Sequence, residues 1–187
     1  MFSQDESPIA RLAAVLGIAV MLMALSYAAF GILVDKTNTF ESIYMRMTYP
    51  DSWQEMDTAF VPDCEEWQCV LVLQQMEYPN AGIIITRVTM NDEQTPQQLE
   101  SRSRESVEGD IIGLFDMTIE GRTAVGRDMT LANDTACDTF IRQIYATRAT
   151  AAFEIQIVVT CQSDFVNVID AIRDMLDSLE LYGGNAI

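Results

Sequence analysis

The sequence contains no histidine and a single lysine among its 187 residues. Histidine is the commonest general base and the commonest nitrogen ligand for metals in proteins, so its absence excludes a Ser/His/Asp catalytic set. Neither a nucleophile elbow nor a phosphate-binding glycine-rich loop is present. The sequence therefore shows no catalytic centre, and we expect a protein that is not an enzyme and needs no cofactor.

Positive charge is scarce throughout the chain. Eleven Lys and Arg residues stand against 28 Asp and Glu residues, which gives a net charge of −17. A chain this acidic has no patch that could neutralise phosphates, which excludes nucleic acid as a partner. An anionic membrane surface would repel it as well. We expect a solvated acidic surface, with docking to a basic protein or collection of cations as the alternatives.

One long apolar run interrupts this acidic composition. Residues 12–34 contain 23 residues without a charge, between Arg11 and Asp35-Lys36. At about 1.5 Å of rise per residue, a helix of this length crosses a hydrocarbon core of about 30 Å. Ser26-Tyr27-Ala28 could pass as a cleavage site, but the run exceeds the apolar part of a secretory signal peptide. We therefore predict an uncleaved signal anchor in the lipid bilayer.

Small residues gather on one side of this predicted helix. At about 100° per residue they fall within an arc of about 60°, which lets a second helix approach closely. Membrane helices are in any case rich in glycine and alanine, which is the alternative explanation. The predicted helix-packing face, which would contact other membrane subunits, consists of Ala10, Ala13, Gly17, Ala24, Ala28 and Gly31.

The hydropathy pattern predicts five segments. They are a polar tail (1–11), the transmembrane helix (12–34), a polar linker (35–42), a soluble domain (43–182) and a C-terminal tail (183–187). Within the domain, alternating or β-branched runs predict strands at 42–49, 70–76, 83–90, 111–120, 122–131, 138–147 and 151–161, and a short one at 59–62. The fold class is therefore α+β, an antiparallel sheet sandwich with two helices.

The two predicted helices differ in character. The first opens at Thr95-Pro96, runs to about Val107 and carries almost no apolar residue, so we expect it on the surface. The second is capped by Ser163 and closed by Gly183-Gly184. Its expected core-facing stripe consists of Phe165, Ile169, Ile172, Leu176 and Leu179.

The four cysteines are Cys64, Cys69, Cys137 and Cys161. A hairpin turn at Arg148-Ala149-Thr150 would place Cys137 and Cys161 opposite each other, close to disulfide range. Cys64 and Cys69 would then pair by default. A four-cysteine metal site and free thiols in a cytosolic domain are the alternatives.

The orientation of the chain in the membrane rests on these cysteines. The positive-inside rule barely discriminates between the two orientations, because Arg11 precedes the apolar run while Lys36 and Arg46 follow it. Disulfides form in oxidising compartments, so we expect the domain on the periplasmic or extracellular side of the cell membrane.

Oxygen-rich clusters provide candidates for a calcium site or for a pair of catalytic carboxylates. None has the spacing of a calcium loop and no carboxylate pair stands out, so we interpret them as solvated loops. These clusters are formed by Asp57, by Asp63, Glu65 and Glu66, by Asn91, Asp92 and Glu93, and by Asn133, Asp134 and Asp138. We expect no metal site.

Two short motifs and the order of elements resemble a known family. The first predicted strand runs into Tyr49-Pro50-Asp51-Ser52-Trp53, and the last predicted helix ends in Asp177-Ser178-Leu179-Glu180-Leu181. This combination resembles the PsbP/DcrB/Mog1-like family of α/β/α sandwich domains over residues 40–182. The resemblance implies a non-enzymatic adaptor with no catalytic residues to carry over. Because the membrane anchor departs from the extrinsic photosynthetic members, their specific role is not transferred.

We therefore expect a non-catalytic, single-pass membrane-anchored accessory subunit of a larger complex, such as a respiratory or photosynthetic one. The alternative is a free-standing, membrane-tethered module that binds or senses a ligand or protein. An enzyme is the third hypothesis.

Overall fold

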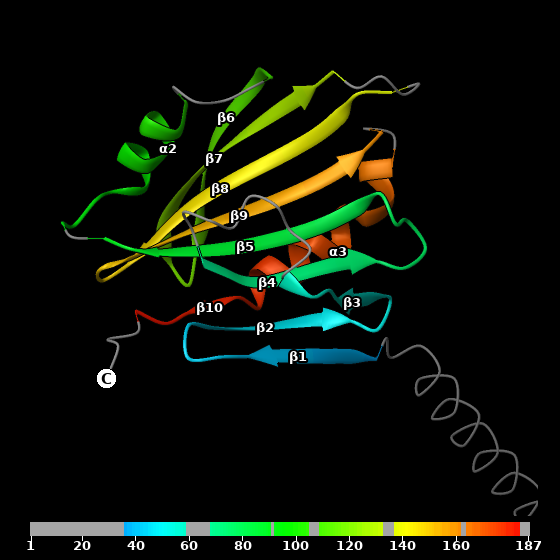
Figure 1. The fold of residues 1–187 in the computed structure, drawn as a ribbon, viewed down its shortest axis with the longest axis horizontal. Helices are drawn as coiled ribbons and strands as arrows, with labels where there is room; N and C mark the ends of the chain where they lie inside the picture. The colour runs from blue at the N-terminus through cyan, green and yellow to red at the C-terminus, as the bar shows by residue number, and fades with distance from the viewer. Residues whose placement is uncertain are drawn as a thin grey trace, which may run out of the picture. The chain divides into compact units, whose positions relative to one another are not determined.

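A computed structural model of the chain describes residues 36–58, 68–90, 92–104, 109–132, 137–161 and 164–183. The chain divides into two compact units, Met1–Lys36 and Thr37–Ile187, and the second holds the described helices and strands (Figure 1). The predicted membrane helix at 12–34 and its packing face lie outside the described residues. No helix within the described ranges combines the length and the apolar character that a membrane crossing requires.

The described strands form two antiparallel sheets. The smaller sheet has the order β1-β2-β10, with β1 at Thr37–Glu41, β2 at Met45–Pro50 and β10 at Glu180–Leu181. The larger sheet has the order β3-β4-β5-β9-β8-β7-β6. Its strands are β3 (Trp53–Glu55), β4 (Gln68–Gln75), β5 (Ala81–Thr89), β6 (Asp110–Ile119), β7 (Arg122–Leu131), β8 (Thr139–Arg148) and β9 (Ala151–Thr160).

The two described helices cover opposite faces of the larger sheet. Successive strand residues point to opposite faces, so Phe153 and Ala152 on β9 look in opposite directions. Phe153 belongs to the main core together with α3 (Phe165–Asp177), which lies behind β4 and β5 in Figure 1. Ala152 packs in a smaller cluster with Leu99 of α2 (Pro96–Arg104). This layering confirms the predicted α+β architecture with two helices.

The two sequence motifs meet where α3 ends against the smaller sheet. Ser178 accepts a hydrogen bond from the Thr48 amide at 3.0 Å and donates one to the Thr48 carbonyl at 3.1 Å. Tyr49 and Trp53 are buried in the main core beside Leu179. Residues of both motifs therefore belong to one core, next to the contact between the end of α3 and β2.

Several boundaries differ from the sequence predictions, three of them by a change of structure. The predicted linker at 35–42 contains strand β1, because its polar residues obtain backbone partners from β2. Trp53 lies outside the strands predicted from the sequence, yet it begins strand β3. Helix α3 ends at Asp177 and is followed by strand β10, so it does not continue to Gly183.

The buried side of α3 also differs in part. The residues of α3 that are buried are Val168, Ile172 and Met175, and Leu179 follows them into the core. Phe165 and Leu176 are only partly buried against this core. The helix is rotated relative to the predicted stripe, which shares only Ile172 and Leu179 with the observed one.

Candidate functional site

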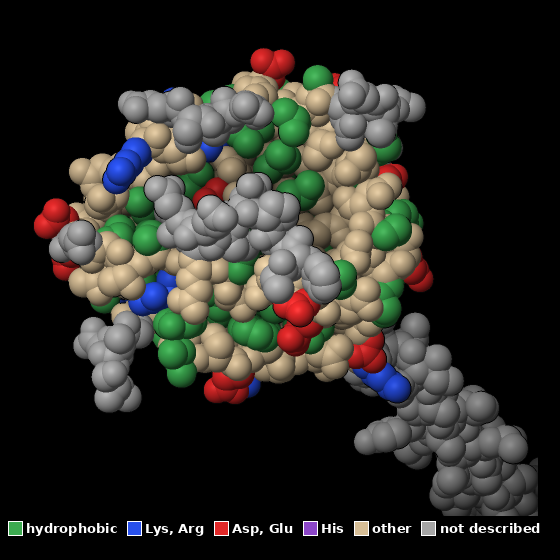
Figure 2. Space-filling model, in the orientation of Figure 1, with side chains coloured by type: hydrophobic (Ala, Val, Ile, Leu, Met, Phe, Trp, Pro, Cys, Tyr) green, Lys and Arg blue, Asp and Glu red, His purple; other side chains and the backbone are tan. Residues whose placement is uncertain are grey.

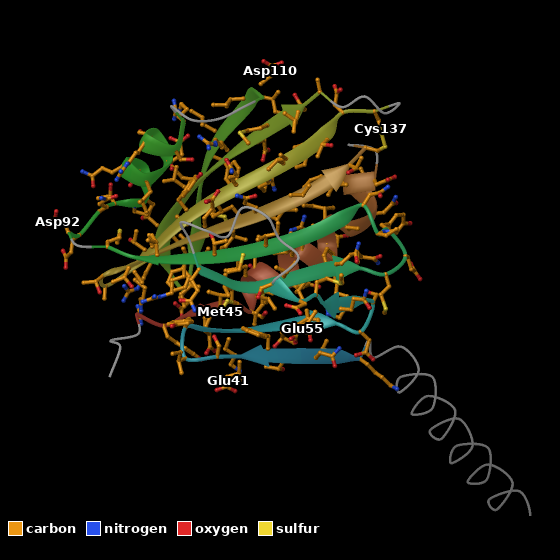
Figure 3. All side chains as sticks on the ribbon, viewed as in Figure 1. Glu41, Met45, Glu55, Asp92, Asp110 and Cys137 are labelled. Carbon is orange, nitrogen blue, oxygen red and sulfur yellow. A yellow bond between two sulfur atoms is a disulfide. The ribbon has the colours of Figure 1, made fainter. Side chains whose placement is uncertain are left out.

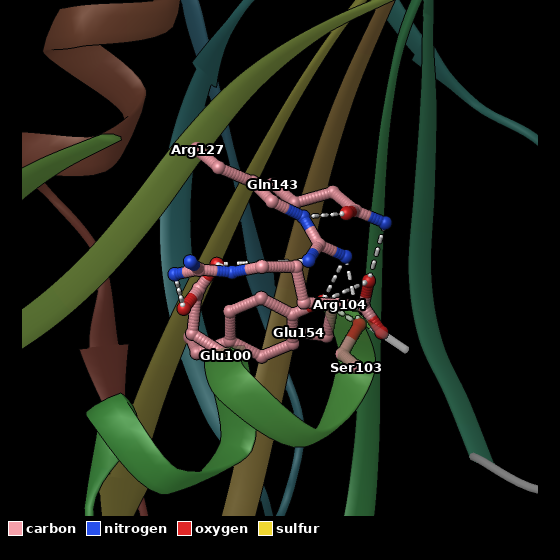
Figure 4. Close-up of polar contacts among 7 residues, drawn as sticks. Glu100, Ser103, Arg104, Arg127, Gln143 and Glu154 are labelled. Atoms are coloured by element: carbon pink, nitrogen blue, oxygen red, sulfur yellow. Dashed lines mark hydrogen bonds and ion pairs between the residues drawn. The ribbon is translucent and has the colours of Figure 1, made fainter. Parts of the chain in front are cut away.

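The densest group of polar contacts lies between helix α2 and the larger sheet (Figure 4). Helix α2 has a polar sequence, yet Glu100 is almost completely buried, at 2% exposure. The group, which we call the α2 network, links side chains from α2 and from strands β7, β8 and β9. Its members are Glu100, Ser103, Arg104, Arg127, Gln143, Tyr145, Glu154 and Gln156.

Two arginines neutralise the buried Glu100 carboxylate. Arg104, one helical turn further along α2, donates two hydrogen bonds to it, from Nε at 3.0 Å and from Nη2. Arg127 of β7 brings Nη1 to 3.6 Å from Glu100 Oε1. The carboxylate holds the pKa of Arg104 above its ordinary value. A buried carboxylate needs such partners, because an unpaired charge in a protein interior is very costly.

Arg127 connects the helix to the polar side chains of β8. Its side chain is completely buried. Nε donates to Gln143 Oε1 at 2.8 Å, and Nη2 donates to Ser103 Oγ at 2.8 Å and to Tyr145 Oη at 3.3 Å. The guanidinium carbon also lies 5.7 Å from the centroid of the Tyr145 ring. The planar fork of arginine suits this role, since it offers several donors in fixed directions.

Glu154 of β9 completes the network. Its Oε1 accepts hydrogen bonds from Gln143 and Gln156, each at 2.9 Å, and from Tyr145 at 3.3 Å. Burial raises the pKa of Glu154, against the opposing effect of these hydrogen bonds and of Arg127. Burial, followed by the nearby Glu154 charge, raises the pKa of Tyr145. The Tyr145 phenol therefore stays protonated as a hydrogen-bond donor and is a poor base.

The geometry of the α2 network favours a structural role. Its hydrogen bonds run from one member to the next, and they fix α2 on the sheet. No nucleophile stands beside an activating base in this group, and the raised pKa of Tyr145 opposes proton abstraction. The α2 network can therefore orient the helix and the surface around it.

Two cavities of ligand size are lined by described residues of the larger sheet. The first, of about 380 Å³, lies between α2 and strands β6 and β7, and Glu100 and Arg104 of the α2 network line it. The second, of about 370 Å³, lies over β4, β5 and β9 and has mainly apolar walls that include Val72, Ile84 and Val158. Both have the size of ligand pockets in proteins.

The disulfide predicted at the β8–β9 hairpin is confirmed. Cys137 and Cys161 are bonded, with their Cα atoms 5.0 Å apart, and Figure 3 shows Cys137 beside the end of β9. Cys69 is also disulfide-bonded, and no described cysteine is free. The predicted Cys64–Cys69 pair involves Cys64, which lies outside the described residues.

Most of the other predicted site residues lie outside the described residues. They are the helix-packing face from Ala10 to Gly31 and Asp63, Glu65, Glu66, Asn91, Asn133 and Asp134. Within the described ranges, no group of three or more cysteines and carboxylates is arranged to hold a metal.

Sequence reasoning missed the α2 network. Two signals could have indicated it. Glu100 and Arg104 stand four residues apart, a spacing that pairs opposite charges on a helix. Arg127 stands between Val125 and Met129 in the strand alternation, on a face that would otherwise be apolar. An arginine in that position needs an acidic partner when the face is covered.

No protein-family model matches the sequence, and no curated protein matches it. Solved structures are similar in fold. The cyanobacterial PsbP protein (CyanoP) of Synechocystis sp. PCC 6803 superimposes with a TM-score of 0.59 at 9% identity, over 81% of this chain and 96% of that one.

Two further structures agree. LpqN of Mycobacterium tuberculosis gives a TM-score of 0.52 at 10% identity, over 80% of this chain and 92% of that one. A point mutant of Mog1 gives 0.50 at 12% identity, over 80% and 96%. At these identities the similarity establishes the fold, which is PsbP/Mog1-like as the sequence motifs indicated.

Proposed function

We propose that the protein is a non-catalytic accessory subunit, anchored in the cell membrane by residues 12–34, whose acidic domain binds a protein partner. The observation that supports this best is an uncharged run of 23 residues attached to a domain of PsbP/Mog1-like fold. The small-residue face of the anchor would pack against other membrane subunits. A respiratory or photosynthetic complex is the kind of host that we propose.

Two observations favour a domain outside the cytoplasm. The Cys137–Cys161 disulfide is stable in oxidising compartments and uncommon in reducing ones. LpqN, one of the proteins of similar fold, is described as involved in cell envelope biogenesis. Both support a periplasmic or extracellular position for the domain.

The internal use of polar groups supports a binding role over catalysis. In the α2 network, two arginines and two carboxylates are paired within the fold. The face of the molecule shown in Figure 2, in contrast, carries several acidic side chains around its rim and fewer basic ones. Such a surface attracts basic proteins and repels nucleic acid.

The test is to solubilise the membrane gently and measure the native size of the tagged full-length protein. We expect migration with stoichiometric partners, and we expect Ala24→Leu to weaken this association. Ala19→Leu is the matched control, because it makes the same change about 140° around the helix from Ala24. A protein that migrates alone, or that responds equally to both substitutions, would refute the proposal.

The second cavity favours one alternative. Its apolar walls and its volume of about 370 Å³ suit a small apolar ligand, which a free-standing tethered module would bind. This alternative requires that the domain keep its binding activity in a membrane where no partner subunit is present.

A further inference from the structure

Strand β6 ends the larger sheet and has a long free edge. Among the described strands, β7 is its only partner. Its ten residues, Asp110–Ile119, include no proline, lysine or arginine, and its register against β7 is regular from Gly113 onward, after a bulge between Ile111 and Gly113. The backbone groups on the outer side of β6 are therefore available to an additional strand.

Apolar side chains are exposed along this edge. Ile112 and Leu114 of β6 are 54% and 55% exposed, and Ile111 and the neighbouring Leu131 of β7 are 38% and 37% exposed. These four make up half of the eight large hydrophobic side chains that are exposed within the described residues. Exposed apolar residues that cluster on a soluble domain usually mark an interaction site.

The cavity beside α2 lies directly inside this edge. Leu114 and Asp116, two residues apart on β6, both line it, together with Val125 of β7 and Gln97 and Arg104 of α2. A strand added next to β6 would alternate its side chains between the two faces of the sheet. Every second side chain would then reach over the cavity, whose volume is about 380 Å³.

The charge of the edge is negative. Asp110, the first residue of β6, is labelled in Figure 3. Both Asp110 and Asp116 are exposed, and neither forms an ion pair within the described residues. Arginines of the neighbouring elements are engaged within the fold, since Arg104 and Arg127 pair with Glu100 and Arg142 pairs with Asp128. A second copy of this chain, with its net charge of −17, would meet like charges here.

We propose that an extended segment of a partner protein, with alternating apolar and basic residues, adds to the free edge of β6. Its apolar side chains cover Leu114 and the mouth of the cavity on one face of the sheet, and its basic side chains pair with Asp110 on the opposite face. The inference rests on the proposed binding function, because it names the chemistry of the partner.

The test uses the full-length protein in detergent micelles and a labelled decapeptide of alternating valine and lysine. One control peptide alternates valine and glutamate, and a second keeps valine and lysine but carries N-methyl groups that block backbone hydrogen bonds. We expect both controls to bind at least about tenfold more weakly. Amide hydrogen exchange should slow along β6 when the first peptide binds.

Two matched variants locate the site. Leu114→Lys should weaken binding of the valine–lysine peptide about tenfold or more, because it adds a like charge at the edge. Val166→Lys changes an apolar residue that is more exposed than Leu114, at 75% against 55%, on α3 at the other face of the sheet. It adds the same charge and should change the affinity less than about twofold.

The proposal is wrong if the N-methylated peptide binds equally well, if the protection falls outside β6, or if both variants weaken binding alike. A dimer that Leu114→Lys dissociates would also overturn it, since the occupant would then be a second copy. A protein that binds the peptide but leaves the membrane alone contradicts only the subunit proposal. A protein that migrates with partners but does not bind the peptide contradicts only this inference.

Discussion

Arg127 on strand β7 and Glu100 on helix α2 lie 3.6 Å apart between Nη1 and Oε1, and both side chains are almost completely buried. The pair crosses the contact between the helix and the sheet. It therefore helps to fix the position of α2 on the sheet. That position could not be predicted from the polar sequence of the helix alone.

The first prediction concerns removal of one charge from this pair. Glu100→Ala leaves Arg127 buried without its acidic partner, so the free energy of unfolding should fall by about 3–5 kcal/mol. Urea unfolding followed by circular dichroism measures the change. Asp170→Ala breaks the exposed Arg173–Asp170 pair, whose partners are 63% and 85% exposed, and should leave the free energy nearly unchanged.

A double variant distinguishes the loss of stability caused by the unpaired charge from the loss caused by reduced packing. Glu100→Leu combined with Arg127→Met removes both charges and fills a similar volume, so it should recover most of the stability lost in Glu100→Ala. If the double variant is as unstable as the sum of its single changes, the pair is not the cause of the loss.

The second prediction concerns Gly126, over which the ring of Phe115 lies. A Cβ at position 126 would clash with Phe115 Cζ and would stand 2.9 Å from the Gln143 carbonyl oxygen. Gly126→Ala should therefore cost about 1–3 kcal/mol of unfolding free energy. Gly113→Ala, where the nearest atom is Asp128 Cβ at 4.0 Å, is the control in the same strand pair and should be tolerated.

Part of this cost should be relieved by a second change. Phe115→Leu in the Gly126→Ala background removes the clashing ring and leaves the carbonyl contact. If thermal unfolding shows no recovery in the double variant, the backbone of β8 and not the Phe115 ring limits the space at Gly126.

The third prediction concerns alkaline pH. Burial, together with the hydrogen bond to Glu55 at 2.6 Å, raises the pKa of Tyr49 from its ordinary 10 to about 12. The unfolded chain therefore releases this proton first as the pH rises, and the stability falls between about pH 10 and about pH 12. Tyr49→Phe removes this contribution, so its unfolding free energy should decline less over that range. Equal declines in both proteins would contradict the assignment.

The fourth prediction concerns the Cys137–Cys161 disulfide, whose cysteines are separated by 24 positions in the sequence. Closing a loop of this length reduces the entropy of the unfolded chain, which corresponds to about 3 kcal/mol. The double variant Cys137→Ser/Cys161→Ser should be destabilised by about this amount in urea unfolding. Hydrogen exchange should also increase first at the adjoining ends of β8 and β9, and a uniform increase would show a different mechanism.

The strands of local hairpins were predictable from the sequence. β8 and β9 pair around Ala149 and Thr150, as the turn residues and the apolar alternation indicated, and Arg148 stands opposite Ala151. Short connections leave few alternative registers, so the position of the Cys137–Cys161 bond followed from the hairpin alone. The fold class followed in the same way from the order of such elements.

Features that depend on distant partners were not predictable. β1 has the sequence TNTFE, without alternation, and becomes a strand because β2 lies beside it. The apolar surface of α3 is wide enough for either Phe165 or Val168 to face inward. Packing against the sheet buries Val168 and leaves Phe165 only partly buried. Glu100 is buried only because Arg127, on another element, compensates its charge.

Strand β10 can join the smaller sheet only late in the synthesis of the domain. Glu180 pairs with Arg46 and Leu181 with Met45, and the Tyr182 amide bonds to the Tyr44 carbonyl at 2.7 Å. A ribosome makes β10 after all the other described strands and helices of the domain. During synthesis one edge of β2 therefore has no strand beside it, and the smaller sheet closes only after α3 has been made.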